Sequence, residues 1–217
     1  MSRFMSRAVL NFCILLCCAS LYAQPIPSKN VRFDSVYQGL TAHAVTTGSF
    51  TQIKRSASIN REFKSSGEYI FSSSGIVWNT IRPFSSVLAI SDSAIVQTLP
   101  DGSHSILTSS DNQVFANIAG SLSSLFSGNR DSLERNFNVK FLSSSTSWKI
   151  ILSPRDATIA SALQSIVLTG KSVSDVQTSL DSMLIEELGG DSIYYAFKNQ
   201  TYKEELSDAE KAFFAAE

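Results

Sequence analysis

Side chains able to act as acids, bases or metal ligands are sparse in this chain of 217 residues. The two histidines, His43 and His104, lie before a strand pattern and beside a turn, and they are too few for a His-rich metal site. Glu186, Glu187 and Asp191 form a compact acidic group near an apolar run. Consecutive carboxylates on a strand point to opposite faces, so we expect a charged sheet edge there and no acid and base pair.

The sequence motifs of common enzyme classes are also missing. The chain contains no G-x-S-x-G, no Walker loop, no G-x-G-x-x-G and no H-E-x-x-H. A formal net charge of −1 gives no basic excess for nucleic acid. We therefore predict a protein that is not an enzyme and that uses no metal, cofactor or nucleic acid.

The first 23 residues are typical of a signal peptide. Arg3 and Arg7 form a basic start, residues 8–19 are apolar apart from Asn11, and Leu21–Ala23 offers a small residue for cleavage. This apolar run is too short to span a bilayer. The pattern predicts a signal peptide at residues 1–23, one domain at residues 24–217, and export across the inner membrane into the periplasm.

The cysteines all belong to this leader. Cleavage after Ala23 would remove Cys13, Cys17 and Cys18, and the formal charge would become −3 because two arginines and no acid are lost. The mature domain would then have no disulfide and no thiolate metal site. The alternative is a lipoprotein signal cut before Cys17 or Cys18, which would anchor the protein by acyl chains. Leu16 is bulkier than the residue expected before Cys17 in such a signal.

The remaining sequence is dominated by period-two patterns that predict strands. Residues 67–84, GEYIFSSSGIVWNTIRPF, indicate two strands joined by a Ser-rich turn that ends at Gly75. Further strands are expected at residues 44–53, 87–91, 94–99, 106–107, 137–142, 148–152, 163–169, within 173–180, 183–188 and 192–198.

Helical spacing interrupts the strand pattern in three places. Short helices are expected near residues 31–40 and after Ser207, where Ser207 and Glu210 have the spacing of a capping box. Apolar residues three and four apart predict another helix over residues 114–126. The expected fold is mainly β with a few helices, a curved antiparallel sheet that forms an incomplete, half-open β-barrel covered by helices.

Two segments carry a family resemblance. Residues 48–54, GSFTQIK, and residues 67–84 have the order Phe-x-Gln, Gly, Trp and Pro. This order resembles the outer-membrane lipoprotein carrier protein (LolA) family, whose members bind acyl chains outside the inner membrane. The resemblance implies a monomeric carrier that takes acylated lipoproteins or lipids from an inner-membrane donor transporter to an outer-membrane acceptor.

One position departs from the family pattern. Family members have Arg-Pro just before the strand with the Trp, where the arginine ties the sheet to its lid, but this chain has Ser72–Ser74 there. Arg82 and Pro83 follow Trp78 and do not match by position. The chain therefore resembles a divergent LolA-like branch, in which the cargo could be a lipid other than a lipoprotein.

The resemblance and the strand parity together predict a lipid-binding cavity. Ile76 and Trp78 share one face of their strand, which we expect to be concave and covered by the central helix. The same alternation is typical of an ordinary core, and Trp148, Tyr194, Tyr195 and Phe197 fit either role. The predicted cavity residues are Phe50, Phe71, Ile76, Trp78, Phe84, Phe115, Ile118 and Leu122.

Two other classes of function fit the same sequence. An outer-membrane lipoprotein receptor would share the fold and carry acyl chains at Cys17 or Cys18. An envelope sensor or scaffold would use the sheet without transferring cargo, and would need a further domain or tether to pass on a signal. The periplasmic carrier is the preferred hypothesis.

Overall fold

The computed structural model describes residues 30–91, 94–108, 123–126, 129–174 and 177–214. The predicted signal peptide lies outside these residues. Eleven strands of the described chain form one antiparallel sheet, with the order β6-β5-β4-β3-β2-β1-β11-β10-β9-β8-β7. The strands are β1 (Val45–Ser56), β2 (Arg61–Ser72), β3 (Gly75–Arg82), β4 (Ser86–Ile90), β5 (Ala94–Thr98), β6 (His104–Thr108), β7 (Phe137–Ser143), β8 (Ser147–Pro154), β9 (Leu163–Ser174), β10 (Gln177–Glu187) and β11 (Ser192–Lys203).

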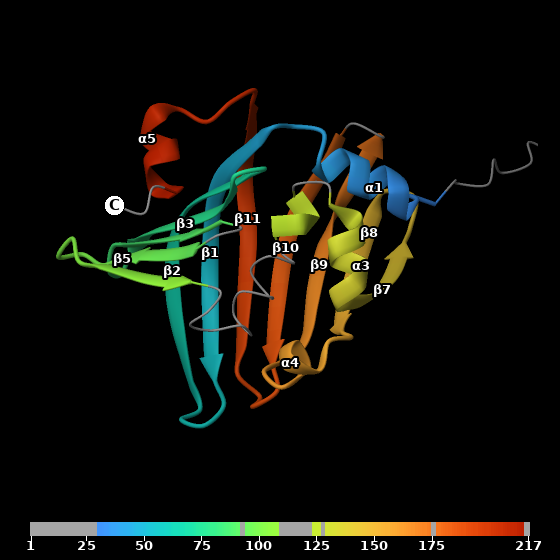
Figure 1. Cartoon of the computed structure of the whole chain (residues 1–217). Coiled ribbons are helices and arrows are strands. Elements are labelled where there is room, and N and C mark those ends of the chain that lie inside the picture. Colours follow the sequence, from blue (N-terminus) through green and yellow to red (C-terminus); the bar gives the residue numbers. More distant parts are fainter. Residues whose placement is uncertain (1–29, 92–93, 109–122, 127–128, 175–176, 215–217) are drawn as a thin grey trace, which may run out of the picture.

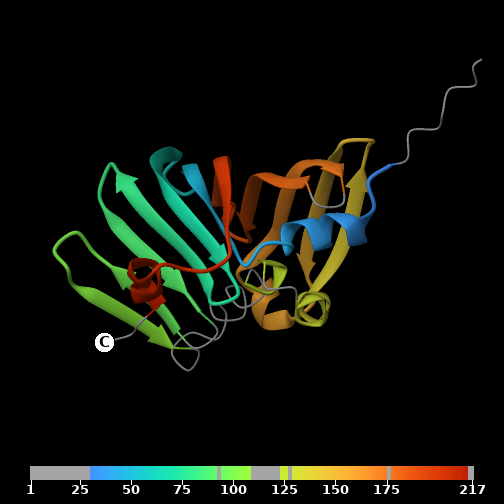
Figure 2. The same ribbon diagram turned by 90° about the horizontal axis from the view of Figure 1, so that it is seen from above.

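The sheet is curved but not closed (Figures 1 and 2). β6 and β7 are the two edges, and they do not pair with each other. The pairing of β1 with β11 brings the beginning and the end of the described chain together near the middle of the sheet. The predicted fold class, an incomplete antiparallel barrel with a few helices, is therefore confirmed.

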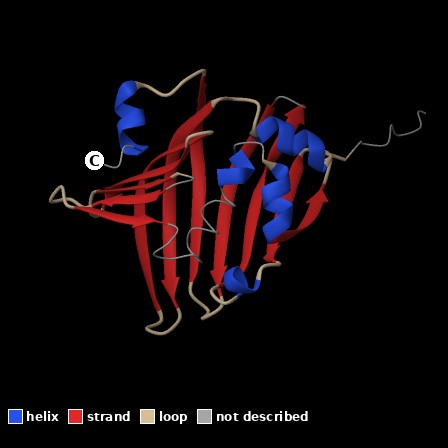
Figure 3. Cartoon of the chain, in the orientation of Figure 1, coloured by secondary structure: helices blue, strands red, loops and turns tan. Residues whose placement is uncertain are grey.

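Short helices complete the structure (Figure 3). They are α1 (Phe33–Leu40), α3 (Arg130–Asn136), α4 (Ala157–Ala160), α5 (Asp208–Lys211), the 3-10 helix η1 (Ala212–Phe214) and the helical residues 123–126. α1, α3, α4 and residues 123–126 all contribute side chains to the main hydrophobic core on one face of the sheet. α5 and η1 lead into a smaller cluster on the opposite face.

Side-chain caps explain where several helices begin. Asn129 Oδ1 accepts from Ser132 N at 3.2 Å and starts α3, and Asp156 Oδ1 accepts from Thr158 N at 2.9 Å and starts α4. The predicted capping box at the start of α5 is present, with Ser207 N donating to Glu210 at 2.8 Å and Glu210 N donating to Ser207 Oγ at 3.3 Å.

Two sequence expectations need correction. Four strands were expected after residue 162, but the structure has three. The polar residues between the predicted apolar runs belong to β9 and β10, which therefore extend further than expected and pair over most of their length. α3 was also missed, since the only helix expected in this part of the chain was the one over residues 114–126. Asn129 begins the next helix by capping it.

Candidate functional site

Aromatic side chains gather on the helix-covered face of β1, β2, β3 and β11. All of them are at most 8% exposed and belong to the main hydrophobic core. We call this cluster the aromatic face, and it consists of Phe50, Tyr69, Phe71, Trp78, Tyr195 and Phe197.

Strand parity on β3 separates the two faces of the sheet. Ile76 and Trp78 belong to the main core with the aromatic face, whereas Val77 packs in the second cluster with Leu206. The sequence-based prediction that Ile76 and Trp78 share one face is confirmed. Their contact with lipid stays a prediction.

The rings form a connected network of edge and stacked contacts. Trp78 lies 5.6 Å from Tyr195 and 6.2 Å from Phe71 between ring centroids. Phe197 contacts Tyr69 at 5.0 Å and Phe71 at 5.7 Å. Aromatic pairs at these separations stabilise a fold by more than the burial of their apolar area alone. The network is thus a continuous apolar surface across four neighbouring strands.

Glycine makes one of these contacts possible. Gly48 and Tyr69 are partners in the β1–β2 register, and a Cβ at position 48 would lie 2.7 Å from Tyr69 Oη and from Lys198 O. No larger residue fits without moving the backbone of β11. The glycine that opens the GSFTQIK segment therefore lets the Tyr69 ring lie across β1.

A short polar chain crosses the aromatic face. Gln52 Nε2 donates to Tyr195 Oη at 2.7 Å, and Ser65 Oγ donates to Gln52 Oε1 at 2.5 Å. Burial raises the pKa of Tyr195 to about 12, although the Gln52 hydrogen bond lowers it. Tyr195 therefore stays neutral at physiological pH. Trp78 Nε1 is buried and has no hydrogen-bond partner in the described part of the chain, so one donor of this cluster is unused.

Phe126 covers the aromatic face directly. Its ring stacks on Phe71 with centroids 4.0 Å apart and an interplanar angle of 13°. A cavity of about 10 Å³ remains beside the two rings, which is about the space that one water needs. The helical residues 123–126 therefore fill the space over Phe71 with the protein's own side chain.

Polar contacts join the covering helices to one another. Tyr37 Oη of α1 donates to Ser124 O at 3.1 Å. Arg130 Nη1 of α3 contacts Asp34 Oδ1 of α1 at 2.7 Å, and the guanidinium lies 4.9 Å from the centroid of Phe33. We call α1, residues 123–126 and α3 the lid. The resemblance led us to expect Arg-Pro where this chain has Ser72–Ser74. Ser72 Oγ donates to Gly75 O within the β2–β3 turn and makes no such tie to the lid among the described residues.

The predicted cavity residues have different outcomes. Phe50, Phe71, Ile76 and Trp78 are brought together on one face. The placement of Phe84 there is wrong, because β3 ends at Arg82 and Phe84 lies in the following turn with 78% of its surface exposed. The three residues expected in the covering helix lie outside the described residues, namely Phe115, Ile118 and Leu122.

Four members of this site were not among the predicted cavity residues, although the sequence allowed Tyr195 and Phe197 either a cavity role or a core role. Tyr195 and Phe197 alternate along β11, so the period-two pattern alone could have placed them on one face. Phe126 belonged to the apolar stripe of the predicted helix over residues 114–126. Tyr69 has the parity of Phe71 on β2 and was not selected.

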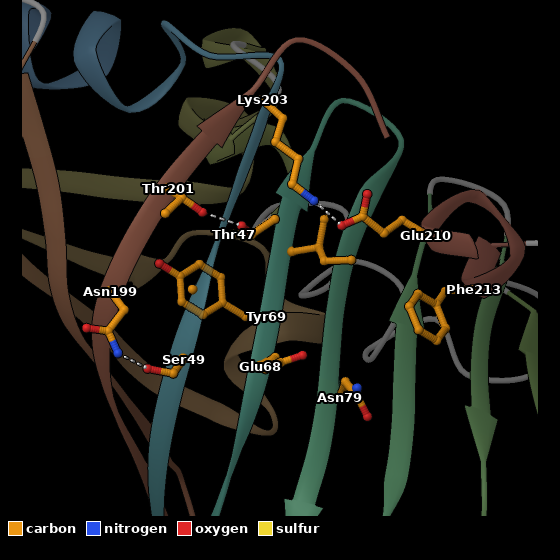
Figure 4. Close-up of a pocket in the computed structure, with 12 residues that line it drawn as sticks. Thr47, Ser49, Glu68, Tyr69, Asn79, Asn199, Thr201, Lys203, Glu210 and Phe213 are labelled. Atoms are coloured by element: carbon orange, nitrogen blue, oxygen red, sulfur yellow. Dashed lines mark hydrogen bonds and ion pairs between the residues drawn. The ribbon is translucent and has the colours of Figure 1, made fainter. Parts of the chain in front are cut away.

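A larger cavity of about 430 Å³ lies on the opposite face, beside α5 (Figure 4). Thr47 and Thr201 share a hydrogen bond of 2.8 Å in its wall, and Lys203 Nζ contacts Glu210 Oε1 at 2.7 Å. Its polar lining also includes Ser49, Glu68, Asn79 and Asn199. A lining of this kind disfavours an acyl chain, because burial of the polar groups against methylenes costs their hydration.

The described residues contain neither a metal-binding cluster nor a membrane-spanning helix. No group of three or more His, Cys, Asp or Glu side chains there could hold a metal ion. None of the described helices is both long enough and apolar enough to cross a membrane.

An open antiparallel sheet with an aromatic face beneath short helices defines a class of half-barrel proteins. The sequence matches the family described as "Outer membrane lipoprotein carrier protein LolA-like" over residues 25–178. The chain belongs to this family. No protein with a curated function matches it.

The solved structures that match this chain are distant from it in sequence. A DUF1329 family protein from Desulfovibrio piger has 10% identity and a TM-score of 0.48, with 81% of this chain and 93% of that chain covered. A LolA superfamily protein from Nitrosomonas europaea has 9% identity and a TM-score of 0.44, with the same two coverages.

Proposed function

We propose that this protein is a periplasmic carrier that shields the acyl chains of lipoproteins or lipids and transfers them from the inner to the outer membrane. Family membership supports the class of function. The observation that carries the proposal is the aromatic face, a broad apolar surface covered by short helices rather than by another sheet.

The chemistry of the face suits acyl chains. Each methylene removed from water contributes about 0.8 kcal/mol, so a carrier gains affinity from apolar contact along the chain. Ile76 supplies aliphatic surface and Trp78 a broad ring. The unused Trp78 Nε1 donor could bind the ester carbonyl of an acyl group, which would orient the chain beneath the lid.

The lid gives a route for reversible uptake. Phe126 occupies the space over Phe71, so an acyl chain has to displace residues 123–126 before it reaches the rings. The stacking contact between Phe126 and Phe71 would be lost, and contact between Phe71 and the acyl chain would compensate for it. Cargo would then move from donor to carrier to acceptor by graded affinity, without catalysis.

Native mass spectrometry with lipid extraction tests the proposal, using the protein purified without detergent from its own periplasm. Co-purified lipoprotein or phospholipid is the expected result and would identify the cargo. A reproducibly empty protein would contradict the carrier and favour the sensor or scaffold. The N-terminal mass separates the receptor, because acylation at Cys17 or Cys18 is expected only for that alternative.

A further inference from the structure

The hairpin formed by the end of β1 and the start of β2 projects beyond the neighbouring strand. The β1–β2 pairing continues to Ser56↔Arg61, whereas β3 begins to pair with β2 only at Ser66. Residues 61–64 of β2 therefore have no strand beside them on the β3 side. Figure 1 places the turn of this hairpin at the end of the sheet opposite α1 and α5.

The tip exposes apolar side chains. Ile59 in the turn is 55% exposed and Phe63 on β2 is 50% exposed. The turn is closed by Asn60, whose φ of 48° is left-handed and which donates from its backbone N to Ala57 O at 3.3 Å. Leu188, 61% exposed, belongs to the β10–β11 turn. That turn is joined to the hairpin by the hydrogen bond from Ala57 N to Asp191 Oδ1, 2.8 Å.

Basic side chains surround these apolar residues. Residues 54–64 contain four cations and one carboxylate, in a chain whose formal net charge is −1. Glu62 pairs with Arg55 at 3.1 Å, and the three other cations are exposed and make none of the ion pairs found in the described residues, namely Lys54, Arg61 and Lys64. We call residues 54–64 the basic hairpin tip.

Acidic groups in and beside the adjoining turn form no ion pair with the cations of the tip among the described residues. Asp191 is engaged by the backbone of Ala57, and Glu186 accepts a hydrogen bond from Ser165 Oγ at 2.5 Å. Glu187 makes no ion pair among the described residues and is the remaining carboxylate of that turn. The cations of the tip are thus available to an external anionic surface.

We propose that the basic hairpin tip docks the protein on an anionic lipid bilayer. Exposed aromatic and aliphatic side chains insert at the boundary between headgroups and acyl chains, and lysine and arginine contact the lipid phosphates. A second copy of the tip is a poor partner, because it would bring like charges together. This inference rests on the proposed carrier function and names the surface that the carrier approaches.

The register connects the tip to the aromatic face. Phe63, Ser65, Tyr69 and Phe71 have the same parity on β2, so their side chains lie on one face of the strand. A bilayer in contact with Phe63 would therefore lie at the beginning of β2, the same strand that carries Phe71. An acyl chain could pass from the bilayer toward the rings along β2 with little exposure to water.

Vesicle co-sedimentation tests the docking. The detergent-free protein should bind phosphatidylglycerol–phosphatidylcholine vesicles and not pure phosphatidylcholine, and binding should weaken as salt screens the charges. The double variant Arg61→Glu, Lys64→Glu should lower the partition coefficient at least about tenfold, and Phe63→Ser should lower it with the cations intact. The matched control is Lys149→Glu, Lys171→Glu, the same charge change on β8 and β9, which should bind like the unaltered protein.

Uptake of a fluorescent fatty acid from solution, measured on the same variants, separates docking from carriage. The tip variants should take up the fatty acid normally. If the tip and control variants bind vesicles equally, or if no vesicle is bound, the docking proposal fails. A further outcome is vesicle binding that depends on the tip while neither the variants nor the unaltered protein bind the fatty acid. In that case the docking proposal stands and the carrier function fails.

Discussion

Phe126 stacks face to face on Phe71, with the ring centroids 4.0 Å apart. Phe71 belongs to β2 and also contacts Trp78 of β3 at 6.2 Å, edge to face. Phe126 belongs to the lid. This one stacked pair therefore connects the lid to the aromatic face, and it occupies the place where the proposed cargo would bind.

Removal of the Phe126 ring should loosen the lid and speed uptake. Phe126→Ala should lower the free energy of unfolding by about 3 kcal/mol, because the lost ring leaves unfilled space over Phe71. Stopped-flow mixing with a fluorescent fatty acid should show faster association. Phe213→Ala, in the cluster on the opposite face, is the control and should leave association unchanged. Equal association rates for Phe126→Ala and the unaltered protein would show that Phe126 does not obstruct the site.

Adjacent residues on β3 allow a matched test of the two faces. Ile76 and Val77 are both 0% exposed but pack in different clusters. Ile76→Ala and Val77→Ala should each lower the free energy of unfolding by about 2–4 kcal/mol. Fatty acid affinity, measured by fluorescence titration, should fall only for Ile76→Ala. A comparable loss of affinity in both variants would mean that binding follows global stability rather than the aromatic face.

Alkaline pH should destabilise the protein through Tyr195. Burial raises its pKa to about 12 in the folded state, against an ordinary value near 10 in the unfolded chain. The folded state thus holds a proton that the unfolded state loses, so this stabilisation is complete below about pH 10 and is lost as pH rises toward 12. Urea denaturation across that window should show a declining free energy of unfolding.

Tyr195→Phe is the control for this pH dependence. It removes the phenol and the hydrogen bond from Gln52, so it should lower stability at neutral pH and flatten the alkaline decline. Tyr69, whose pKa burial also raises to about 12, would still contribute to the remaining slope. An unchanged slope in Tyr195→Phe would show that Tyr195 is not a source of the effect.

The contact between Arg130 and Asp34 should affect the motion of the lid more than global stability. Both side chains are partly exposed, so Asp34→Asn should change the free energy of unfolding by less than about 1 kcal/mol. Amide hydrogen exchange in α1 should nevertheless become faster, because α1 loses its ion pair to α3. Asp208→Asn, which removes the exposed pair with Lys211 in α5, should leave exchange in α1 unchanged. Unaltered exchange in both variants would exclude this ion pair as a restraint on the lid.

Much of the fold followed from local patterns in the sequence. The alternation in residues 67–84 predicted β2 and β3, and the parity of Ile76, Trp78 and Val77 predicted which side chains face together. The spacing of Ser207 and Glu210 predicted the cap of α5. These features depend on residues close in sequence, where the period of a strand or the reach of a capping side chain decides the outcome.

Phe84 shows where local parity fails. Its aromatic character placed it with Trp78, but the strand ends at Arg82 and the side chain follows the turn into solvent. Tyr195 shows the reverse case, since nothing local distinguishes a ring in the site from a ring that seals a sheet. Tyr195 is placed beside Gln52, and so within the aromatic face, only by the pairing of β1 with β11.

The sequence by itself determined the strand pattern, the two-sided character of β2 and β3, and the resemblance to lipid carriers. The tertiary structure decided that β11 lies beside β1, that Phe126 covers Phe71, and that a basic hairpin tip projects past β3. The physical reason is the range of the interactions. Alternation and capping act between near neighbours in the chain, whereas strand order and ring stacking join distant segments through the burial of shared apolar surface.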